Sequence, residues 1–386
     1  MSDATRPVSP KRDRLDPPPA PDETRWLDGS RGHRLWSGVW HPAPSELPDR
    51  GTVVVAHGFG EYAGRYGHVI AALTGHGYMV VALDHRGHGP SEGVRFRIAR
   101  FDDFVADLDL AVALAREVAA ARSAEPRPPF LFGHSMGGLI ATRYVLALPD
   151  QTALAGLILS SPALQLTSDL SGPALWATGL LARVAPTLPV RRGDGGLSSD
   201  PEIGRRWAAD PLVNHGPTSV QMAHQIATAT RDAPARLDRI TLPLLLFYGE
   251  ADTIVDPAGS VALAERAGST DLTVRPWPGL LHETFNEPNG DAVIAEMMAW
   301  LDDRTGRDPD VVTQGGSHGN GMVAESDPIP SPSPAHRLAQ PQQRLRLTGA
   351  QGRGQPSVSG PGRSRDPPGA SERPLRLVRV VRRGRV

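Results

Sequence analysis

The stretch FLFGHSMGGLIA, residues 130–141, decides the fold of this chain. An apolar run typical of a buried strand comes first, a helix-forming run follows, and Ser135 lies between them. Gly133 and Gly137 stand two residues before and two residues after the serine. A strand that turns this sharply into a helix brings those flanking positions too close together for side chains. We therefore expect a tight strand–turn–helix element with Ser135 as a nucleophile, the alternative being a glycine-rich turn with an incidental serine.

The sequence on both sides of this turn alternates between short apolar runs and amphipathic segments. The runs that predict strands are 51–58, 78–87, 128–135, 154–163, 242–249 and 271–279. The segments that predict helices are 68–77, 101–122, 136–148, 257–268 and 292–303. Strands that are nearly all apolar and alternate with helices are typical of a mainly parallel sheet covered on both faces. The predicted fold class is α/β.

The alternation pauses between about 165 and 240, where an inserted helical cap is expected between two strands of the sheet. The segment ALWATGLLARVAPTLPV, residues 174–190, combines Leu, Trp and Val with few polar partners. One interpretation is an ordinary buried helix. The other is a lid that lines an acyl pocket and touches lipid.

The two ends of the chain differ from its middle. Residues 1–24 are polar and proline-rich, and residues 307–386 are rich in Pro, Gly, Ser, Gln and Arg without a sustained apolar period. We predict a disordered leader and a disordered tail around a folded domain at 25–306. The basic end LRLVRVVRRGRV, residues 375–386, indicates a solvated tail or, alternatively, a contact with anionic lipid or nucleic acid.

Composition excludes several classes of function. The chain has 386 residues, a formal net charge of −1 and no cysteine, so disulfides, thiolate metal sites and cysteine nucleophiles are excluded. The near-zero charge gives no nucleic-acid signature. The N-terminus has no apolar signal-peptide core, and no run reaches the ~18 apolar residues of a membrane span. We expect a cytoplasmic protein, at most peripherally associated with a membrane.

A serine hydroxyl needs a base, and the chain order expected for this turn is serine, acid, histidine. Downstream of the serine, the folded region contains His215, His224 and His282. The first two lie in the expected cap. His282 lies in RPWPGLLHETFNEP, residues 275–288, just after the last strand. A loop there meets the carboxyl edge of the sheet beside Ser135, so His282 is the predicted base.

The acid should follow the strand at 242–249, where Glu250, Asp252 and Asp256 lie close together. Asp256 precedes a proline that opens a helix, which is the pattern of an N-cap. Glu250 directly follows the strand and belongs to the turn. Asp252 lies in the loop proper and is the favoured partner of the histidine Nδ1–H, with the other two as alternatives.

Acyl transfer also needs two donors for the developing oxyanion. The residue after the nucleophile, Met136, offers one backbone N–H. The loop HGFGEYAGRY after the first predicted strand offers the other, at Phe59. His57, His85 and His88 precede the serine in the chain, and we expect structural roles for them.

Six segments occur in an order that resembles the monoacylglycerol lipase/lysophospholipase family of α/β-hydrolases, bacterial members in particular. They are HGFGEYAGRY (57–66), LDHRGHGPSEG (83–93), GHSMGG (133–138), DPLVNHG (210–216), GEADTIVDP (249–257) and PGLLHETFNEP (278–288). The resemblance covers about residues 25–304 and departs from many relatives at Leu281, where those carry an aromatic residue. It implies an α/β-hydrolase fold and a serine hydrolase of medium- or long-chain monoacylglycerols.

The resemblance also implies a triad of Ser135, Asp252 and His282, oxyanion donors at Phe59 and Met136, and a mobile cap whose apolar outer face meets membrane or micelle. No metal or organic cofactor is needed for this chemistry, and no nucleic-acid partner is expected. The sequence makes no prediction of oligomeric state.

Other activities use the same triad: lysophospholipase, broad carboxylesterase, cofactor-free haloperoxidase or C–C bond hydrolase. Dehalogenases and epoxide hydrolases are disfavoured because they place an aspartate at the nucleophile position. A non-catalytic binding protein on the same fold is a remote alternative, since it would ordinarily carry a broken triad.

Overall fold

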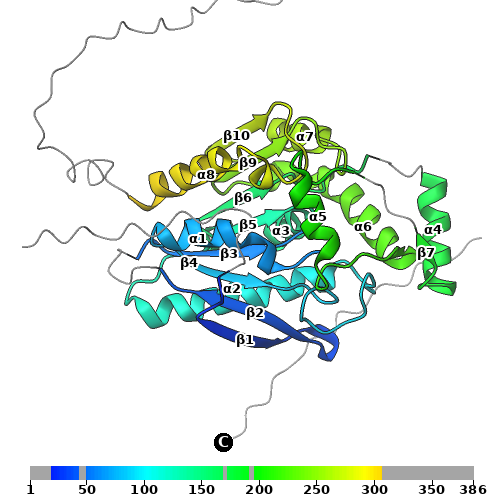
Figure 1. Ribbon diagram of the computed structural model, residues 1–386, viewed down its shortest axis with the longest axis horizontal. Coiled ribbons are helices and arrows are strands. Elements are labelled where there is room, and N and C mark those ends of the chain that lie inside the picture. Colours follow the sequence, from blue (N-terminus) through cyan, green and yellow to red (C-terminus); the bar gives the residue numbers. More distant parts are fainter. Residues whose placement is uncertain (1–18, 43–48, 168–171, 191–194, 307–386) are drawn as a thin grey trace, which may run out of the picture. The chain divides into compact units, whose positions relative to one another are not determined.

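The computed structural model describes residues 19–42, 49–167, 172–190 and 195–306. The tail predicted at 307–386 lies outside the described residues, as does most of the predicted leader. Within the described part, an eight-stranded sheet forms the centre and helices run along both of its faces (Figure 1). No helix in this part is both long and apolar enough to cross a membrane.

The sheet is mixed at one edge and parallel elsewhere. Its spatial order is β1 (Glu23–Asp28), β2 (Arg34–Trp40), β4 (Met79–Leu83), β3 (Thr52–Ala56), β5 (Phe130–His134), β6 (Gly156–Ser160), β9 (Leu244–Gly249) and β10 (Leu272–Trp277). β2 pairs antiparallel with both β1 and β4, and the remaining neighbours are parallel. The predicted mainly parallel sheet with helices on both faces is confirmed.

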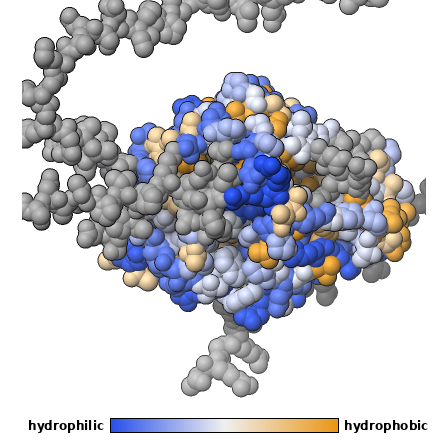
Figure 2. Space-filling view, viewed as in Figure 1, coloured by the Kyte–Doolittle hydropathy of each residue, from blue (hydrophilic) through white to orange (hydrophobic). Residues whose placement is uncertain are grey.

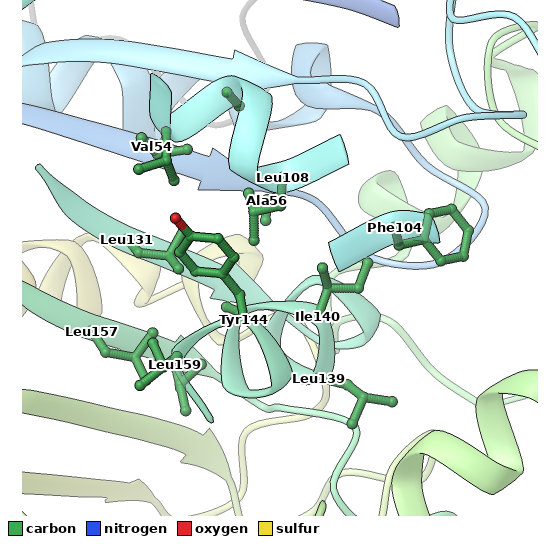
Figure 3. Packing of buried hydrophobic residues seen from close by; sticks show 14 of the residues in the cluster. Val54, Ala56, Phe104, Leu108, Leu131, Leu139, Ile140, Tyr144, Leu157 and Leu159 are labelled. Atoms are coloured by element: carbon green, nitrogen blue, oxygen red, sulfur yellow. The ribbon is translucent and has the colours of Figure 1, made fainter. Parts of the chain in front are cut away.

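Two hydrophobic clusters lie on the two faces of the sheet. Successive side chains of a strand point to opposite faces, so Val54 and Ala56 join one cluster while Val53 and Val55 join the other. The first cluster contains residues of α2 (Asp102–Arg122), α3 (Met136–Ala147) and α7 (Ala258–Arg266), and the second contains residues of α1 (Gly67–Gly75) and α8 (Gly290–Thr305). Figure 3 shows Phe104, Leu108, Ile140 and Tyr144 among the packed residues of the first.

β1 and β2 were not predicted from the sequence. β1 begins at Glu23, so regular backbone starts before the domain boundary expected at residue 25. Most of its side chains are exposed, and an edge strand of this kind has no continuous apolar run to reveal it. Its register with β2 pairs Trp26 with Trp36, and the Arg34 guanidinium lies 5.0 Å from the centre of the Trp26 ring. Long-range pairing rather than local pattern therefore defines this edge.

The described part of the chain between β6 and β9, where the cap is predicted, contains three α-helices and two short strands that pair with each other. These are α4 (Gly172–Val184), α5 (Pro201–Ala209) and α6 (Val220–Asp232), with β7 (Pro189–Val190) antiparallel to β8 (Thr218–Ser219). Of the residues of α4, Ala182 alone is buried, so α4 is not an ordinary buried helix. Trp176 and Val184 are each 72% exposed. Apolar surface gathers at the edge of the molecule where Figure 1 places α4 (Figure 2).

Candidate active site

Ser135 occupies the turn between β5 and α3, as the sequence predicts. Its φ of 52° and ψ of −117° lie in a region that residues other than glycine rarely adopt, at a cost of about 1–3 kcal/mol. Three backbone hydrogen bonds hold the turn: Ser135 N–H donates to Ser160 O, and the N–H groups of Leu139 and Ala163 donate to Ser135 O. The strain places the serine at the carboxyl end of β5, which is the position that a nucleophile on this fold requires.

The glycines on either side of Ser135 have no room for a side chain, because neighbouring backbone occupies the position of a Cβ. A Cβ on Gly137 would lie 2.1 Å from the carbonyl oxygen of Ala56. A Cβ on Gly133 would lie 2.6 Å from the carbonyl oxygen of Gly137. Both distances are far below van der Waals contact, so the close approach inferred from the sequence is present in the structure.

His282 and Asp252, which lie on different loops, are in direct contact. His282 Nδ1 donates to Asp252 Oδ2 at 2.6 Å, and both side chains are nearly buried. The other oxygen, Asp252 Oδ1, accepts the backbone N–H groups of Ile254 and Val255. Since a carboxylate that takes Nδ1–H fixes the imidazole tautomer, His282 Nε2 carries a lone pair and can take up a proton.

The other two acids of this loop have different partners. Glu250 is exposed, and its backbone N–H donates to Trp277 O in the turn after β9. Asp256 Oδ1 accepts the backbone N–H of Ala258, the first residue of α7, at 2.9 Å. The helix begins one residue later than the proline at which it was expected. Of the three acids, Asp252 is the one that contacts the histidine.

The loop after β3 brings Phe59 to the same edge of the sheet, and Met136 is the first residue of α3. His57 Nδ1–H donates to Gly58 O at 2.8 Å, and His57 Nε2 accepts the backbone N–H of His85 at 2.9 Å. Because a trans peptide is planar, holding the Gly58 carbonyl directs the Phe59 N–H the opposite way. His57 therefore has a structural role in setting the orientation of this peptide.

Buried titratable groups surround this loop. Burial lowers the pKa of His85 to about 3 and that of His88 to about 4, so both rings are neutral near pH 7. Burial also raises the pKa of Asp84 to about 8. Among the described residues, no group of three or more His, Asp or Glu side chains could hold a metal ion. These side chains fill the interior beside the site.

The described structure contains polar contacts to the site that sequence reasoning missed. Ser161, with a φ of 40°, donates from Oγ to the carbonyl oxygen of His282 at 2.9 Å. Arg65 lies between Glu61 and Glu283, which belong to the loops of Phe59 and His282. The i, i+4 spacing of Glu61 and Arg65 and the acid directly after His282 were the available signals.

A serine at a strand-to-helix turn, with an acid and a histidine on later loops at the same edge of a parallel sheet, defines the class of α/β-hydrolases. The sequence profile of a family described as serine aminopeptidase, S33, matches residues 48–289. The match spans more than half of the chain, and the chain belongs to this family. It is a serine ester hydrolase, and its predicted similarity to the monoacylglycerol lipases is confirmed.

Three relatives illustrate the similarity. The chain is 35% identical over 274 residues to a monoacylglycerol lipase of Mycolicibacterium smegmatis, covering 71% of this chain and 94% of the relative. A phospholipase of Bacillus subtilis is 30% identical, with 65% of this chain and 94% of the relative covered. The crystal structure of a monoacylglycerol lipase of Paleococcus ferrophilus is 33% identical, with a TM-score of 0.61 over 70% of this chain and 99% of that chain.

Proposed function

We propose that this protein hydrolyses monoacylglycerols to glycerol and a fatty acid through an acyl-enzyme on Ser135. The observation that carries the proposal is the 2.6 Å hydrogen bond from His282 Nδ1 to Asp252 Oδ2 at the edge of the sheet where the Ser135 turn lies. A neutral imidazole with a fixed tautomer is what a serine needs as a general base. Similarity to monoacylglycerol lipases over most of the chain supports the choice of substrate.

In the first half of the reaction, His282 Nε2 takes the proton of Ser135 Oγ as the oxygen attacks the ester carbonyl. Asp252 stabilises the imidazolium that forms and stays ionised. The imidazolium then gives its proton to the leaving glycerol oxygen as the ester C–O bond breaks. In the second half, His282 takes a proton from water, the hydroxide oxygen attacks the acyl-enzyme, and Ser135 regains its proton as the fatty acid leaves.

Backbone amides of Phe59 and Met136 stabilise the negative charge that develops on the carbonyl oxygen. Met136 N–H lies at the N-terminus of α3, where the helix dipole adds to the stabilisation. The orientation of the Gly58 carbonyl supports the assignment of Phe59. Loss of one such donor typically lowers kcat by about 10²–10³-fold.

The lipid substrate and a peripheral contact with membrane or micelle involve the predicted cap. Trp176, Leu180 and Val184 of α4 are at least half exposed, and burying the exposed part of each in a lipid surface would stabilise the bound state by less than the ~1.5–3 kcal/mol of a fully exposed side chain. Apolar residues in this number on one helix are unusual on a protein surface that meets only water. We propose that the cap extends from about residue 165 to about residue 240.

A lysophospholipase is the second candidate, because the phospholipase relative of Bacillus subtilis matches 65% of this chain. A lysophospholipid shares the single acyl ester with a monoacylglycerol and differs in its charged headgroup. The same triad would cleave both, so the difference lies in affinity for the headgroup.

A substrate panel tests the proposal. Initial rates are compared for 1-lauroylglycerol, lauroyl lysophosphatidylcholine and p-nitrophenyl butyrate. We expect the highest kcat/KM on 1-lauroylglycerol, a fall of about 10⁶-fold in kcat for Ser135→Ala, and unchanged rates for the control Ser123→Ala at the end of α2. A preference for the lysophospholipid would favour the second candidate. Near-normal turnover by Ser135→Ala would refute the mechanism.

A further inference from the structure

The segment HETFNEP begins with His282, but its next residue, Glu283, has no part in the proton transfers. Glu283 is buried, and its carboxylate meets Arg65 in a two-pronged contact: Nη1 to Oε1 at 2.6 Å and Nη2 to Oε2 at 2.8 Å. The same Nη1 also lies 2.5 Å from Glu61 Oε2. The Arg65 side chain is 11% exposed, and the two acids are 5% or less. One guanidinium thus joins two buried carboxylates from distant parts of the chain.

Glu61, at one end of the Glu61–Arg65–Glu283 cluster, belongs to the loop after β3 that carries the proposed oxyanion donor Phe59. We call this segment the oxyanion loop. Glu61 Oε1 accepts the backbone N–H of Gly58 at 2.6 Å and the hydroxyl of Tyr66 at 2.6 Å. Gly58 is the residue before Phe59, and a Cβ on Gly58 would lie 3.2 Å from Ser135 Cβ. The loop that Glu61 holds therefore packs directly on the nucleophile.

At the other end lies the loop of the base. Glu283 is joined to His282 by a peptide bond, and Glu283 Oε2 also accepts the side-chain amide of Asn286 at 2.7 Å. Ser161, which directly follows β6, donates from Oγ to the His282 carbonyl oxygen. A displacement of the Glu283 carboxylate would move the backbone on which the imidazole is mounted.

We infer that Arg65 is a positioning residue that fixes the distance between the oxyanion loop and the histidine loop. The inference rests on the proposed function, because it assigns to Arg65 the geometry of the Phe59 donor and the His282 base. A planar guanidinium makes parallel hydrogen bonds to a carboxylate, which sets angle as well as distance. A misplacement of about 1 Å can lower the rate about 10²-fold.

Electrostatics supports a geometric reading of this cluster. Burial raises the pKa of Glu283, but the Arg65 charge outweighs it and brings the pKa to about 2. Burial alone would lower the pKa of Arg65, yet the charges of Glu283 and Glu61 raise it. Removing the cation would leave two buried carboxylates without a counter-charge and would destabilise the fold for that reason alone. The informative substitution is therefore Arg65→Lys, which keeps the positive charge but cannot make the two parallel hydrogen bonds to Glu283.

The chain offers a matched control in Arg50. Arg50 Nη1 contacts Asp302 Oδ1 at 2.7 Å, and the two side chains are 13% and 12% exposed. Arg50 precedes β3 and so lies at the opposite end of that strand from the oxyanion loop. Arg50→Lys disturbs a comparably buried ion pair without touching either loop.

The experiment measures kcat, KM and thermal unfolding for the unaltered enzyme, Arg65→Lys and Arg50→Lys, with p-nitrophenyl butyrate as a soluble substrate. We expect Arg65→Lys to lower kcat by about 10²-fold while KM stays close to the unaltered value. Arg50→Lys should keep kcat even where its Tm falls as far. A kcat for Arg65→Lys equal to that of Arg50→Lys, or an effect confined to KM, would overturn the inference.

Glu283→Gln is the second variant and decides the matter if Arg65→Lys does not fold. It keeps the shape of the side chain and one acceptor but loses the two-pronged ion pair. We expect the same selective loss of kcat, and an unchanged kcat would contradict the inference. Failure of the proposed function would be seen differently, because the unaltered enzyme itself would then hydrolyse no ester.

Discussion

The carboxyl edge of the sheet and the helix α4 both depart from the usual rule that apolar side chains are buried and polar side chains are exposed, but in opposite directions. At the edge, Ser135, Asp252 and His282 are polar or titratable and yet 7% exposed or less. On α4, Trp176 and Val184 are apolar and yet 72% exposed. Buried polar groups and exposed apolar groups are the two departures that carry information about function. We propose that the first region serves chemistry away from bulk water and that the second contacts an apolar surface.

The two regions also differ in how their side chains are held. The side chains of Asp252 and His282 contact each other, and Asp252 accepts three hydrogen bonds, two of them from backbone. The apolar side chains of α4 rest on a helix with one buried residue. Substitutions at the edge should therefore have large and specific effects, and substitutions on α4 small and graded ones.

The largest effect is expected where two neighbouring acids of one loop are compared. Asp252→Asn should lower kcat by about 10⁴-fold, because an amide in that place favours the wrong histidine tautomer. Asp256→Asn removes a carboxylate that accepts the first backbone N–H of α7 and should cost up to about 1 kcal/mol of unfolding free energy with kcat nearly unchanged. Esterase assays and chemical denaturation measure both. Equal losses of kcat would mean that the division of roles between the acids is wrong.

Two glycines compare packing at the edge with packing in α5, another helix of the predicted cap. Gly137→Ala would place a Cβ 2.1 Å from the Ala56 carbonyl oxygen, and we expect a loss of about 1–3 kcal/mol in unfolding free energy. Gly204 lies inside α5, where a Cβ meets nothing within 4 Å. Gly204→Ala should stabilise by about 0.5–1 kcal/mol through its helix propensity. Denaturant titration of both variants gives the two signs; a tolerated Gly137→Ala would contradict the tight turn.

Acid should destabilise the edge through its buried histidines. The pKa of His85 is lowered from 6.5 to about 3 by burial and by the neighbouring His88, so the folded state resists a proton that the unfolded state accepts. The free energy of unfolding therefore keeps its full value above pH 6.5 and falls as the pH drops toward 3. The fall is up to about 1.4 kcal/mol per pH unit for each buried histidine of this kind. His85→Gln should flatten this slope. Unfolding at pH 7, 6 and 5 measures it, and an unchanged slope would exclude His85 as a source.

The smallest effect is expected on α4. Trp176→Ser should weaken binding to liposomes several-fold, since a Trp side chain contributes about 1.5–3 kcal/mol when it leaves water and part of it stays wet at an interface. Turnover of a soluble ester should stay the same. Trp26→Ser on β1, where the side chain is 44% exposed, is the control and should bind liposomes normally. Equal losses in the two variants would remove α4 from the lipid contact.

The sequence predicted those parts of the structure that depend on residues close together in the chain. The run 130–141 fixed the strand, the turn and the helix because two glycines leave few other conformations. The apolar strands followed from the alternation, and the order of serine, acid and histidine is the one expected for a serine at such a turn. The structure contains the expected contact between His282 and Asp252, and their catalytic roles stay a prediction. Asp256 accepts the backbone N–H of Ala258, but the N-cap of α7 is Pro257 and not Asp256 as expected.

Long-range contacts were beyond the sequence. The ion pair of Arg65 with Glu283 joins residues 218 positions apart, and nothing in either segment names its partner. β1 was missed because its pairing with β2 is visible only in three dimensions. For α4, a single helical pattern allowed both a buried and an exposed helix, since exposure depends on what packs against it.

The central claim is that Ser135 is a nucleophile activated by His282. The most direct test is to treat the protein with a fluorophosphonate and locate the adduct by peptide mass mapping. We expect one adduct, on Ser135, with no labelling of Ser135→Ala and labelling slowed by orders of magnitude in His282→Ala. An adduct on another residue, or equally fast labelling without the histidine, would contradict it.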